Sequence, residues 1–143
     1  MQNFDEYSYQ CGVMDAFCEV VGAGVKQLAL SHPFTSLAEM NHYLSYAEQL
    51  CKTYHLSCYP ETTILITDLF PYSMNKGKYN ILFYKEPKVL ETYLKLKQQK
   101  AELVKHNAYQ AEKRMNIALA FGELLSYDKQ SCMDKIAHNH EKE

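Results

Sequence analysis

Three side chains that could bind a metal or act as nucleophiles lie close together in the sequence: Cys51, His55 and Cys58. Their C-x3-H-x2-C spacing could bring three zinc ligands together at a helix end, because thiolates and imidazole nitrogens are common zinc ligands. The neighbouring sequence offers no fourth ligand, and Cys51 also belongs to an apolar stripe. We therefore interpret the cysteines as core residues and expect neither a metal nor another cofactor. A small metalloprotein or ligand sensor stays the second alternative.

Motifs that carry catalytic or nucleotide chemistry are absent from the sequence. The chain has no P-loop, no H-E-x-x-H and no G-x-S-x-G. Gly22-Ala23-Gly24 could cradle a phosphate, but the surrounding residues lack the G-x-G-x-x-G pattern. Close approach of a neighbouring helix, or a helix break, explains these glycines better. We therefore name no catalytic residue, and the sequence favours a protein that is not an enzyme.

The cysteine usage and the first residues of the chain indicate a compartment. The five cysteines are odd in number, and no two form a C-x-x-C pair. Free thiols of this kind are typical of the cytosol. The first residues are acidic, unlike a secretory signal, and no stretch has the roughly eighteen apolar residues of a membrane span. We expect a cytoplasmic protein without membrane contact.

Two helices are predicted in the N-terminal half. Apolar residues recur at helical spacing over residues 6–30, and Asp5 can cap this helix. The run is apolar on more than one face, which indicates a buried helix. Ser36 and Glu39 form a capping box in front of a second helix at 37–54. Its apolar stripe has steps of three and four residues: Leu37, Met40, Leu44, Ala47, Cys51 and Tyr54.

A change of pattern predicts a β-hairpin at about residues 62–84. Residues 62–67 are mostly β-branched, and residues 79–84 are aromatic and aliphatic, so both segments are typical of strands. Proline, asparagine and glycine in the connecting segment favour a turn. Because a two-stranded ribbon is barely stable alone, it must pack on a helix or pair with another chain.

A long helix is predicted at about residues 87–126, where strong helix formers follow an initial proline. About 38 residues at about 1.5 Å each span about 57 Å, whereas a compact domain of this size is about 40 Å across. The helix must therefore break, with His106-Asn107 as the expected place, or extend onto a second subunit. A short helix is expected after Tyr127, followed by a frayed tail at 138–143.

These elements predict one mostly helical α+β domain over residues 1–143. It would contain two N-terminal helices, a β-hairpin, a long C-terminal helix that is continuous or broken near 106–107, and a short tail. Hydrophobic residues make up 47% of the chain and charged residues 22%, close to the averages for folded proteins. A chain of this length can bury a core without disulfides or metals.

Charge is segregated along the chain. Residues 1–75 carry two lysines against eight acids, a net charge of −6, and residues 76–114 carry ten basic residues against four acids, a net charge of +6. A basic hairpin and a long helix loosely fit a winged-helix protein with a dimerising tail, so a nucleic-acid-binding accessory protein is the first alternative. Against it, Arg114 is the single arginine, and arginine makes the commonest specific base contact. We expect no sequence-specific nucleic-acid binding.

The spacing of small residues in the long helix predicts an interface between chains. One stripe follows heptad steps of three and four, and its small residues let a partner helix approach closely. We expect a non-enzymatic protein that acts through helix-mediated self-association, as a homodimer or larger oligomer, or through binding another protein. The residues expected in this interface are Lys97, Ala101, Val104, Ala108, Ala111, Met115, Ala118 and Gly122.

Overall fold

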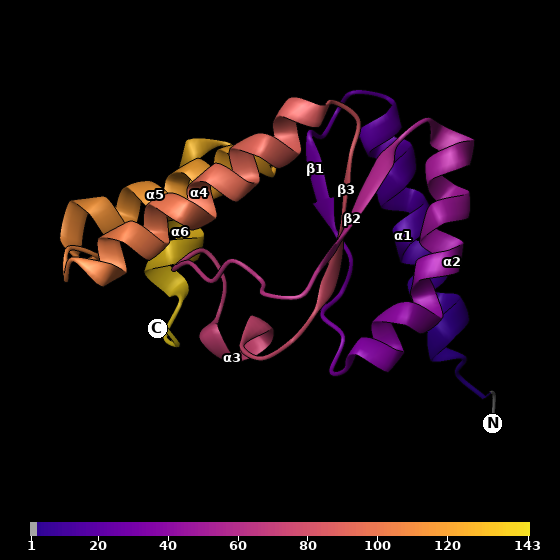
Figure 1. The fold of residues 1–143 in the computed structure, drawn as a ribbon, viewed down its shortest axis with the longest axis horizontal. Helices are drawn as coiled ribbons and strands as arrows, with labels where there is room; N and C mark the ends of the chain where they lie inside the picture. The colour runs from indigo at the N-terminus through magenta and orange to yellow at the C-terminus, as the bar shows by residue number, and fades with distance from the viewer. Residues whose placement is uncertain (1–2) are drawn as a thin grey trace. The chain divides into compact units, whose positions relative to one another are not determined.

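The structure, a computed structural model, describes residues 3–143 and confirms a mostly helical α+β fold (Figure 1). The chain divides into two compact units. The first comprises the described residues up to Ile64 and the segment Gly77–Lys85, and it holds the sheet and two helices. The second comprises Leu65–Lys76 and Glu86–Glu143 and is helical. No helix in the described part of the chain is long and apolar enough to cross a membrane.

The sheet of the first unit has three antiparallel strands in the order β1-β3-β2. β1 (Leu28–Leu30) and β2 (Ser57–Glu61) are the edge strands, and β3 (Asn80–Tyr84) lies between them. Phe83 in β3 pairs with a residue of each edge strand. All five residues of β3 are buried, and Ile81–Tyr84 form the continuous apolar run that is typical of a central strand.

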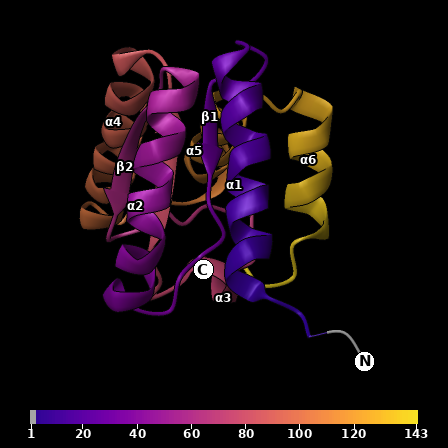
Figure 2. The ribbon, with the colours of Figure 1, turned by 90° about the vertical axis from the view of Figure 1, so that its right-hand side faces the viewer.

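Two helices, α1 (Glu6–Gly22) and α2 (Leu37–Tyr54), lie side by side and pack on this sheet (Figure 2). Asp5 accepts the Ser8 N–H at the start of α1, and Ser36 caps α2 in the same way, as predicted. The side chains between the helices and the sheet form one core. Its buried members are Cys11, Met14, Cys18, Val21, Ala29, Phe34, Met40, Tyr43, Ala47, Leu50, Ile81 and Phe83.

The second unit is a helical hairpin with a further helix packed on it. α5 folds back beside α4, and α6 packs on α5 (Figure 1). Phe121 of α5 lies near the centre of the core, with its ring 6.1 Å from that of Tyr93 and 6.2 Å from that of Phe70. The helices of this unit are α3 (Tyr72–Asn75), α4 (Pro87–Lys105), α5 (Ala111–Leu124) and α6 (Lys129–His138).

The first helix is shorter than the predicted 6–30, because α1 ends at Gly22 and residues 28–30 form β1. Gly24 has a φ of 79°, a left-handed conformation that glycine adopts without steric cost. The N–H of Val25 bonds back to a carbonyl of the last turn at 3.2 Å, which completes a common helix-ending motif. The glycines therefore break the helix, and they form no phosphate-binding loop pattern.

The prediction of a strand at 62–67 is wrong, because the partner of β3 is β2, just before it. The sequence did not predict this strand because it contains Pro60, and proline is depleted in strands although an edge strand tolerates it. The Glu61 carboxylate accepts the N–H of Thr63 at 2.9 Å, and this bond turns the chain out of the sheet. The second predicted strand, at 79–84, is confirmed as β3.

The predicted helix at 87–126 is broken at the expected place. α4 ends at Lys105, and Asn107 has a φ of 54°, which asparagine tolerates better than most residues. The N–H of Ala108 donates to the Leu103 carbonyl at 2.8 Å and closes the helix end. The return of α5 beside α4 replaces the alternative of one continuous helix that extends onto a second subunit.

The prediction of a frayed tail at 138–143 is wrong, whereas the short helix expected before it is confirmed as α6. Asn139 is only 6% exposed, and its side-chain amide donates to the Asp68 carbonyl at 2.9 Å. The Glu141 carbonyl accepts the N–H of Tyr72 at 2.7 Å. The polar composition of this segment gave no sign of these bonds, because their partners lie about 70 residues away in the sequence.

Gly122→Ala should destabilise the protein by about 1–3 kcal/mol, as overpacking of a tight site does. The added methyl group would collide with the thiol of Cys132 and lie 3.6 Å from Leu69. Gly12→Ala is the matched control, because nothing lies within 4 Å of that added methyl group. Alanine there should stabilise α1 by about 0.5–1 kcal/mol. Urea unfolding measures both, and equal effects would contradict the close packing of α6 on α5.

Candidate functional site

The three residues considered as metal ligands do not form a cluster. His55 is exposed at the end of α2, whereas Cys51 and Cys58 are half-buried and pack on the core of the first unit. Within residues 3–143, no group of three or more histidine, cysteine, aspartate or glutamate side chains could hold a metal ion. Cys51 and Cys58 do meet, because their thiols form a hydrogen bond. All five cysteines are free thiols.

The hydrogen bond between Cys51 and Cys58 makes their acidities unequal. It lowers the pKa of Cys58 by stabilising that thiolate. The same hydrogen bond raises the pKa of Cys51, and burial adds to this effect. Cys18 is fully buried in the same core, and burial raises its pKa to about 12. Cys58 is therefore the thiol of this group that ionises first.

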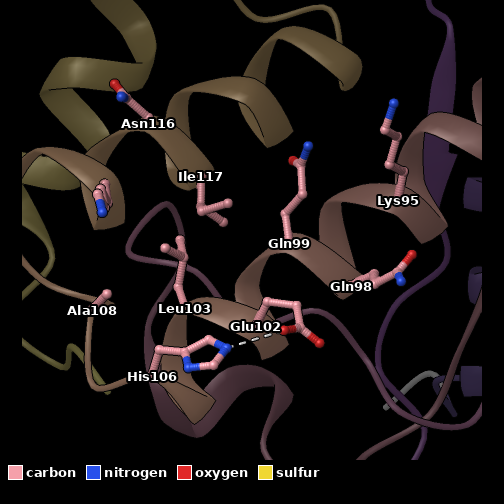
Figure 3. A pocket seen from close by; sticks show the side chains of 10 residues that line it. Lys95, Gln98, Gln99, Glu102, Leu103, His106, Ala108, Asn116 and Ile117 are labelled. Carbon is pink, nitrogen blue, oxygen red and sulfur yellow. Dashed lines mark ion pairs between the residues drawn. The ribbon is translucent and has the colours of Figure 1, made fainter.

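A groove of about 680 Å³ lies between α4 and α5 (Figure 3). Its floor is apolar, because Leu103 of α4 and Ile117 of α5 point toward each other, and Ala108 of the connecting loop is a further apolar lining residue. Ile117 is 5% exposed, and Leu103 and Ala108 are half-buried. Polar side chains form the rim: Lys95, Gln98, Gln99, Glu102, His106, Lys113 and Asn116.

The charge of the groove is mostly positive. Lys95 on α4 and Lys113 on α5 are both exposed. Glu102 is the one acid among the lining residues, and its carboxylate lies 3.4 Å from the Nε2 atom of His106. Both of these side chains are well exposed, so this pair contributes little to stability. The groove therefore combines an apolar floor with two lysines and a row of amides.

The eight residues predicted to form an interface between chains take different positions. Ala118 and Gly122 are fully buried inside the second unit, where Gly122 contacts Cys132 of α6 and Leu69. Self-association through this stripe stays a prediction, and only its exposed members can contact a second chain without rearrangement. These are Ala101, Val104 and Ala111, and the half-buried members are Lys97, Ala108 and Met115.

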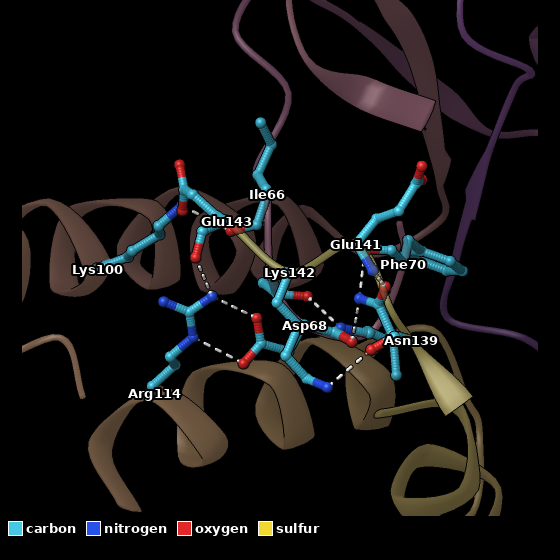
Figure 4. A network of polar contacts seen from close by, with 11 residues as sticks. Ile66, Asp68, Phe70, Lys100, Arg114, Asn139, Glu141, Lys142 and Glu143 are labelled. Atoms are coloured by element: carbon cyan, nitrogen blue, oxygen red, sulfur yellow. Dashed lines mark hydrogen bonds and ion pairs between the residues drawn. The ribbon is translucent and has the colours of Figure 1, made fainter. Parts of the chain in front are cut away.

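A polar network holds an irregular segment of the second unit against its helices (Figure 4). Arg114 donates to both carboxylate oxygens of Asp68 and to the Glu143 carbonyl, each at 2.7 Å. The Lys100 ammonium group donates to the Ile66 carbonyl and to the Glu143 carboxylate, also at 2.7 Å each. The side chain of Asp68 is only 8% exposed, so its charge needs the guanidinium group beside it.

The irregular segment depends on side-chain partners because it is buried without belonging to a helix or strand. Leu65, Thr67 and Leu69 are each less than 5% exposed. The N–H of Leu65 donates to the Tyr93 hydroxyl at 3.2 Å, and that of Leu69 donates to the Thr67 hydroxyl at 3.1 Å. A buried backbone group without a partner would be costly, so these bonds and the network together hold the segment in place.

Some basic residues of the segment 76–114 contact aromatic rings of the same chain. The Lys100 ammonium group lies 5.2 Å from the centre of the Tyr109 ring, and the Arg114 guanidinium lies 4.8 Å from it. The Lys97 ammonium group lies 5.8 Å from the Tyr93 ring. These contacts account for three of the ten basic residues in 76–114, whereas the groove lysines are exposed.

The groove residues gave little signal in the sequence. Gln98, Gln99 and Asn116 lie on exposed helix positions, where an amide resembles any solvated residue. Only the break at Asn107 pointed to a helical hairpin, and a hairpin creates a groove between its helices. No protein-family model, curated protein or solved structure matches the chain.

Cys58 should react with iodoacetamide before Cys51, because the thiolate is the nucleophile and Cys58 has the lowered pKa. As pH falls, labelling of Cys58 should persist to a lower pH than labelling of Cys51. Cys51→Ala removes the hydrogen bond and should slow the labelling of Cys58 several-fold. Peptide mass spectrometry after timed labelling measures both, with buried Cys18 as the unreactive control. Faster labelling of Cys51 would contradict the assignment.

Arg114→Met should destabilise the protein by about 3 kcal/mol, because it leaves the buried Asp68 carboxylate without its partner. Lys113→Met is the matched control on the same helix, since Lys113 is exposed and its loss should change stability by less than about 0.5 kcal/mol. Denaturant unfolding of both variants measures the difference. Equal stabilities would show that the network does not hold the irregular segment.

Proposed function

We propose that the protein is a non-enzymatic, cytoplasmic binding protein whose groove between α4 and α5 holds a segment of a protein partner. The observation that best supports this is the apolar floor of Leu103 and Ile117 inside a rim of amides and lysines. Protein interfaces combine an apolar centre with a polar rim in this way. An amphipathic helix laid in an apolar groove is a common mode of peptide recognition.

The rim indicates the chemistry of the partner. Lys95 and Lys113 favour a segment with acidic residues beside its apolar face, because complementary charges speed and orient docking. The side-chain amides of Gln98, Gln99 and Asn116 can both donate to and accept from a polypeptide. Nucleic acid is the less favoured occupant, since the floor is apolar and phosphate contacts alone would need more basic residues than two lysines.

Self-association is part of the proposal, because α4 also has an exposed apolar flank. Leu94 is 38% exposed and Val104 is 52% exposed, with exposed Ala101 between them. Ala101 and Val104 belong to the heptad stripe that predicts a homodimer, and Leu94 precedes them on the same helix. A second copy of the chain is therefore one candidate partner for this helical hairpin, beside a different protein.

A photoreactive benzoylphenylalanine in place of Gln99 should form a discrete protein adduct in cells, because Gln99 lines the groove. The same residue in place of Gln130, exposed on α6 outside the groove, is the control and should give no such adduct. Lys95→Glu with Lys113→Glu should reduce the Gln99 adduct about tenfold or more, because two favourable charges become repulsive. Mass spectrometry of the adduct identifies the partner.

Three outcomes would contradict this function. One is a Gln99 adduct no stronger than that of Gln130, and another is an adduct that the double charge reversal leaves unchanged. The third is an adduct with nucleic acid alone that disappears at physiological salt, which would favour the alternative of a nucleic-acid accessory protein. An adduct with a second copy of this chain would support the self-association form of the proposal.

A further inference from the structure

We propose that Cys51 and Cys58 form a site of reversible oxidation, at which a peroxide converts the two thiols into one disulfide. The two side chains come from different elements of the first unit, since Cys51 lies in the last turn of α2 and Cys58 lies in the edge strand β2. Their thiols nevertheless contact each other through a hydrogen bond. Neither residue lines the groove between α4 and α5, so the site does not depend on the proposed binding function.

The backbone between the two cysteines is hydrogen-bonded in a way that keeps the thiols together. The Cys51 carbonyl accepts the N–H of His55 and the N–H of Leu56, the second at 2.9 Å. His55 has a φ of 57°, and this left-handed residue turns the chain from α2 directly into β2. Leu56 packs on the core, and from Ser57 onward β2 is paired with β3. The contact between the thiols therefore rests on hydrogen-bonded backbone on both sides.

The hydrogen bond also selects the partner of Cys58. Two cysteines whose side chains point apart cannot be bridged without backbone movement, whereas hydrogen-bonded thiols already point toward each other. Cys18 of α1 lies in the same core and is the rival partner. It is 0% exposed, and burial raises its pKa to about 12, so it neither meets an oxidant nor ionises near neutral pH. Cys51 is therefore the thiol that can bond to Cys58.

Access and acidity make Cys58 the thiol that reacts first. Both cysteines of the pair are half-buried, and Ser57 and Pro60 beside Cys58 on the edge strand are exposed. The hydrogen bond from Cys51 lowers the pKa of Cys58, and the thiolate is the form that attacks a peroxide. The negative charge of Glu48 opposes the ionisation of both thiols, so the reaction should quicken as the pH rises. Redox-sensing cysteines share this arrangement of an accessible thiol beside a second thiol that resolves it.

The reaction with hydrogen peroxide has two balanced steps. In the first, the Cys58 thiolate attacks one peroxide oxygen and the O–O bond breaks, which leaves Cys58 as a sulfenic acid. The departing hydroxide takes up the proton that Cys58 released and becomes water. In the second, the Cys51 sulfur attacks the Cys58 sulfur, the S–O bond breaks, and the hydroxide leaves as water with the Cys51 proton. The two sulfurs lose two electrons in total, which reduce one peroxide to two waters, and a dithiol reductant reverses the change.

Peptide mapping of the full chain after treatment with a small molar excess of hydrogen peroxide tests the proposal. Iodoacetamide first blocks the remaining thiols, and trypsin then cleaves after Lys52, which puts the two cysteines on separate peptides, 27–52 and 53–76. Before reduction these peptides should be joined, and dithiothreitol should separate them. The pair should be oxidised at least tenfold faster than Cys11 or Cys132, because both are buried and burial raises the pKa of each.

Two variants separate the steps. Cys51→Ser should halt the reaction at the Cys58 sulfenic acid, which dimedone traps, because no thiol remains to displace its hydroxide. Cys58→Ser should lower dimedone labelling of peptide 27–52 and of the whole chain at least tenfold relative to Cys51→Ser. The matched control is Cys132→Ser, which removes a buried thiol of the second unit and should leave the joining of the two peptides unchanged.

Several results would overturn the proposal. These are a disulfide of Cys58 with Cys18, a disulfide between two chains, and oxidation of the pair no faster than that of Cys11. Conversion of Cys58 in the wild type to a sulfinic acid in place of a disulfide would overturn it as well, since Cys51 would then not resolve the first product. The wild-type peptide map decides these points without any variant, so a variant that fails to fold leaves the test intact. Failed cross-linking at Gln99 would contradict the binding groove alone.

Discussion

Each main reversal of this chain depends on one residue in the left-handed region of backbone conformation. An N–H after each of these residues bonds to a carbonyl five positions earlier, which satisfies the open end of the helix. The left-handed conformation costs an L-residue about 1–2 kcal/mol, so the three capping residues that are not glycine are strained. Each of them ends its helix sharply. The four residues are Gly24 after α1, His55 after α2, Asn107 after α4 and Ser126 after α5.

The two sites with chemical interest follow from these reversals. The cap at His55 leads directly from α2 into β2, and this brings the Cys58 thiol back to the thiol of Cys51. The cap at Asn107 sends α5 back beside α4, and the groove exists only because the two helices lie together. His55 has the sequence spacing of a metal ligand, but in the structure its backbone conformation ends α2. The spacing of His55 to the two cysteines raised the possibility that the three lie close together, and the structure brings Cys51 and Cys58 together while His55 is exposed.

Local chemistry in the sequence predicted the elements whose signals lie within a few residues. The caps at Asp5 and Ser36, the stripe of α2 and the break near Asn107 are all of this kind. The wrong predictions concern residues whose partners are distant in the sequence or whose residue type is uncommon in the element that they form. Pro60 is a residue type that strands rarely contain, so its edge strand was not predicted. The sequence predicts a frayed tail because the partner of Asn139, the carbonyl of Asp68, is far away in the chain. The groove was not predicted, because its amide rim resembles any solvated helix face.

Apolar periodicity specifies which face of a helix must be covered, but not what covers it. The heptad stripe of the C-terminal half predicts contact between chains, yet Ala118 and Gly122 are covered within the same chain, Gly122 by Cys132 and Leu69. α1 shows the opposite case. Its apolar character on more than one face predicted a buried helix, but the residues that it buries, Cys11, Met14, Cys18 and Val21, lie on one face. Tyr9, Phe17 and Val20 stay exposed although they are apolar. The periodicity of α1 therefore predicted the face that packs on the core, whereas its apolar composition overstated how much of the helix is buried.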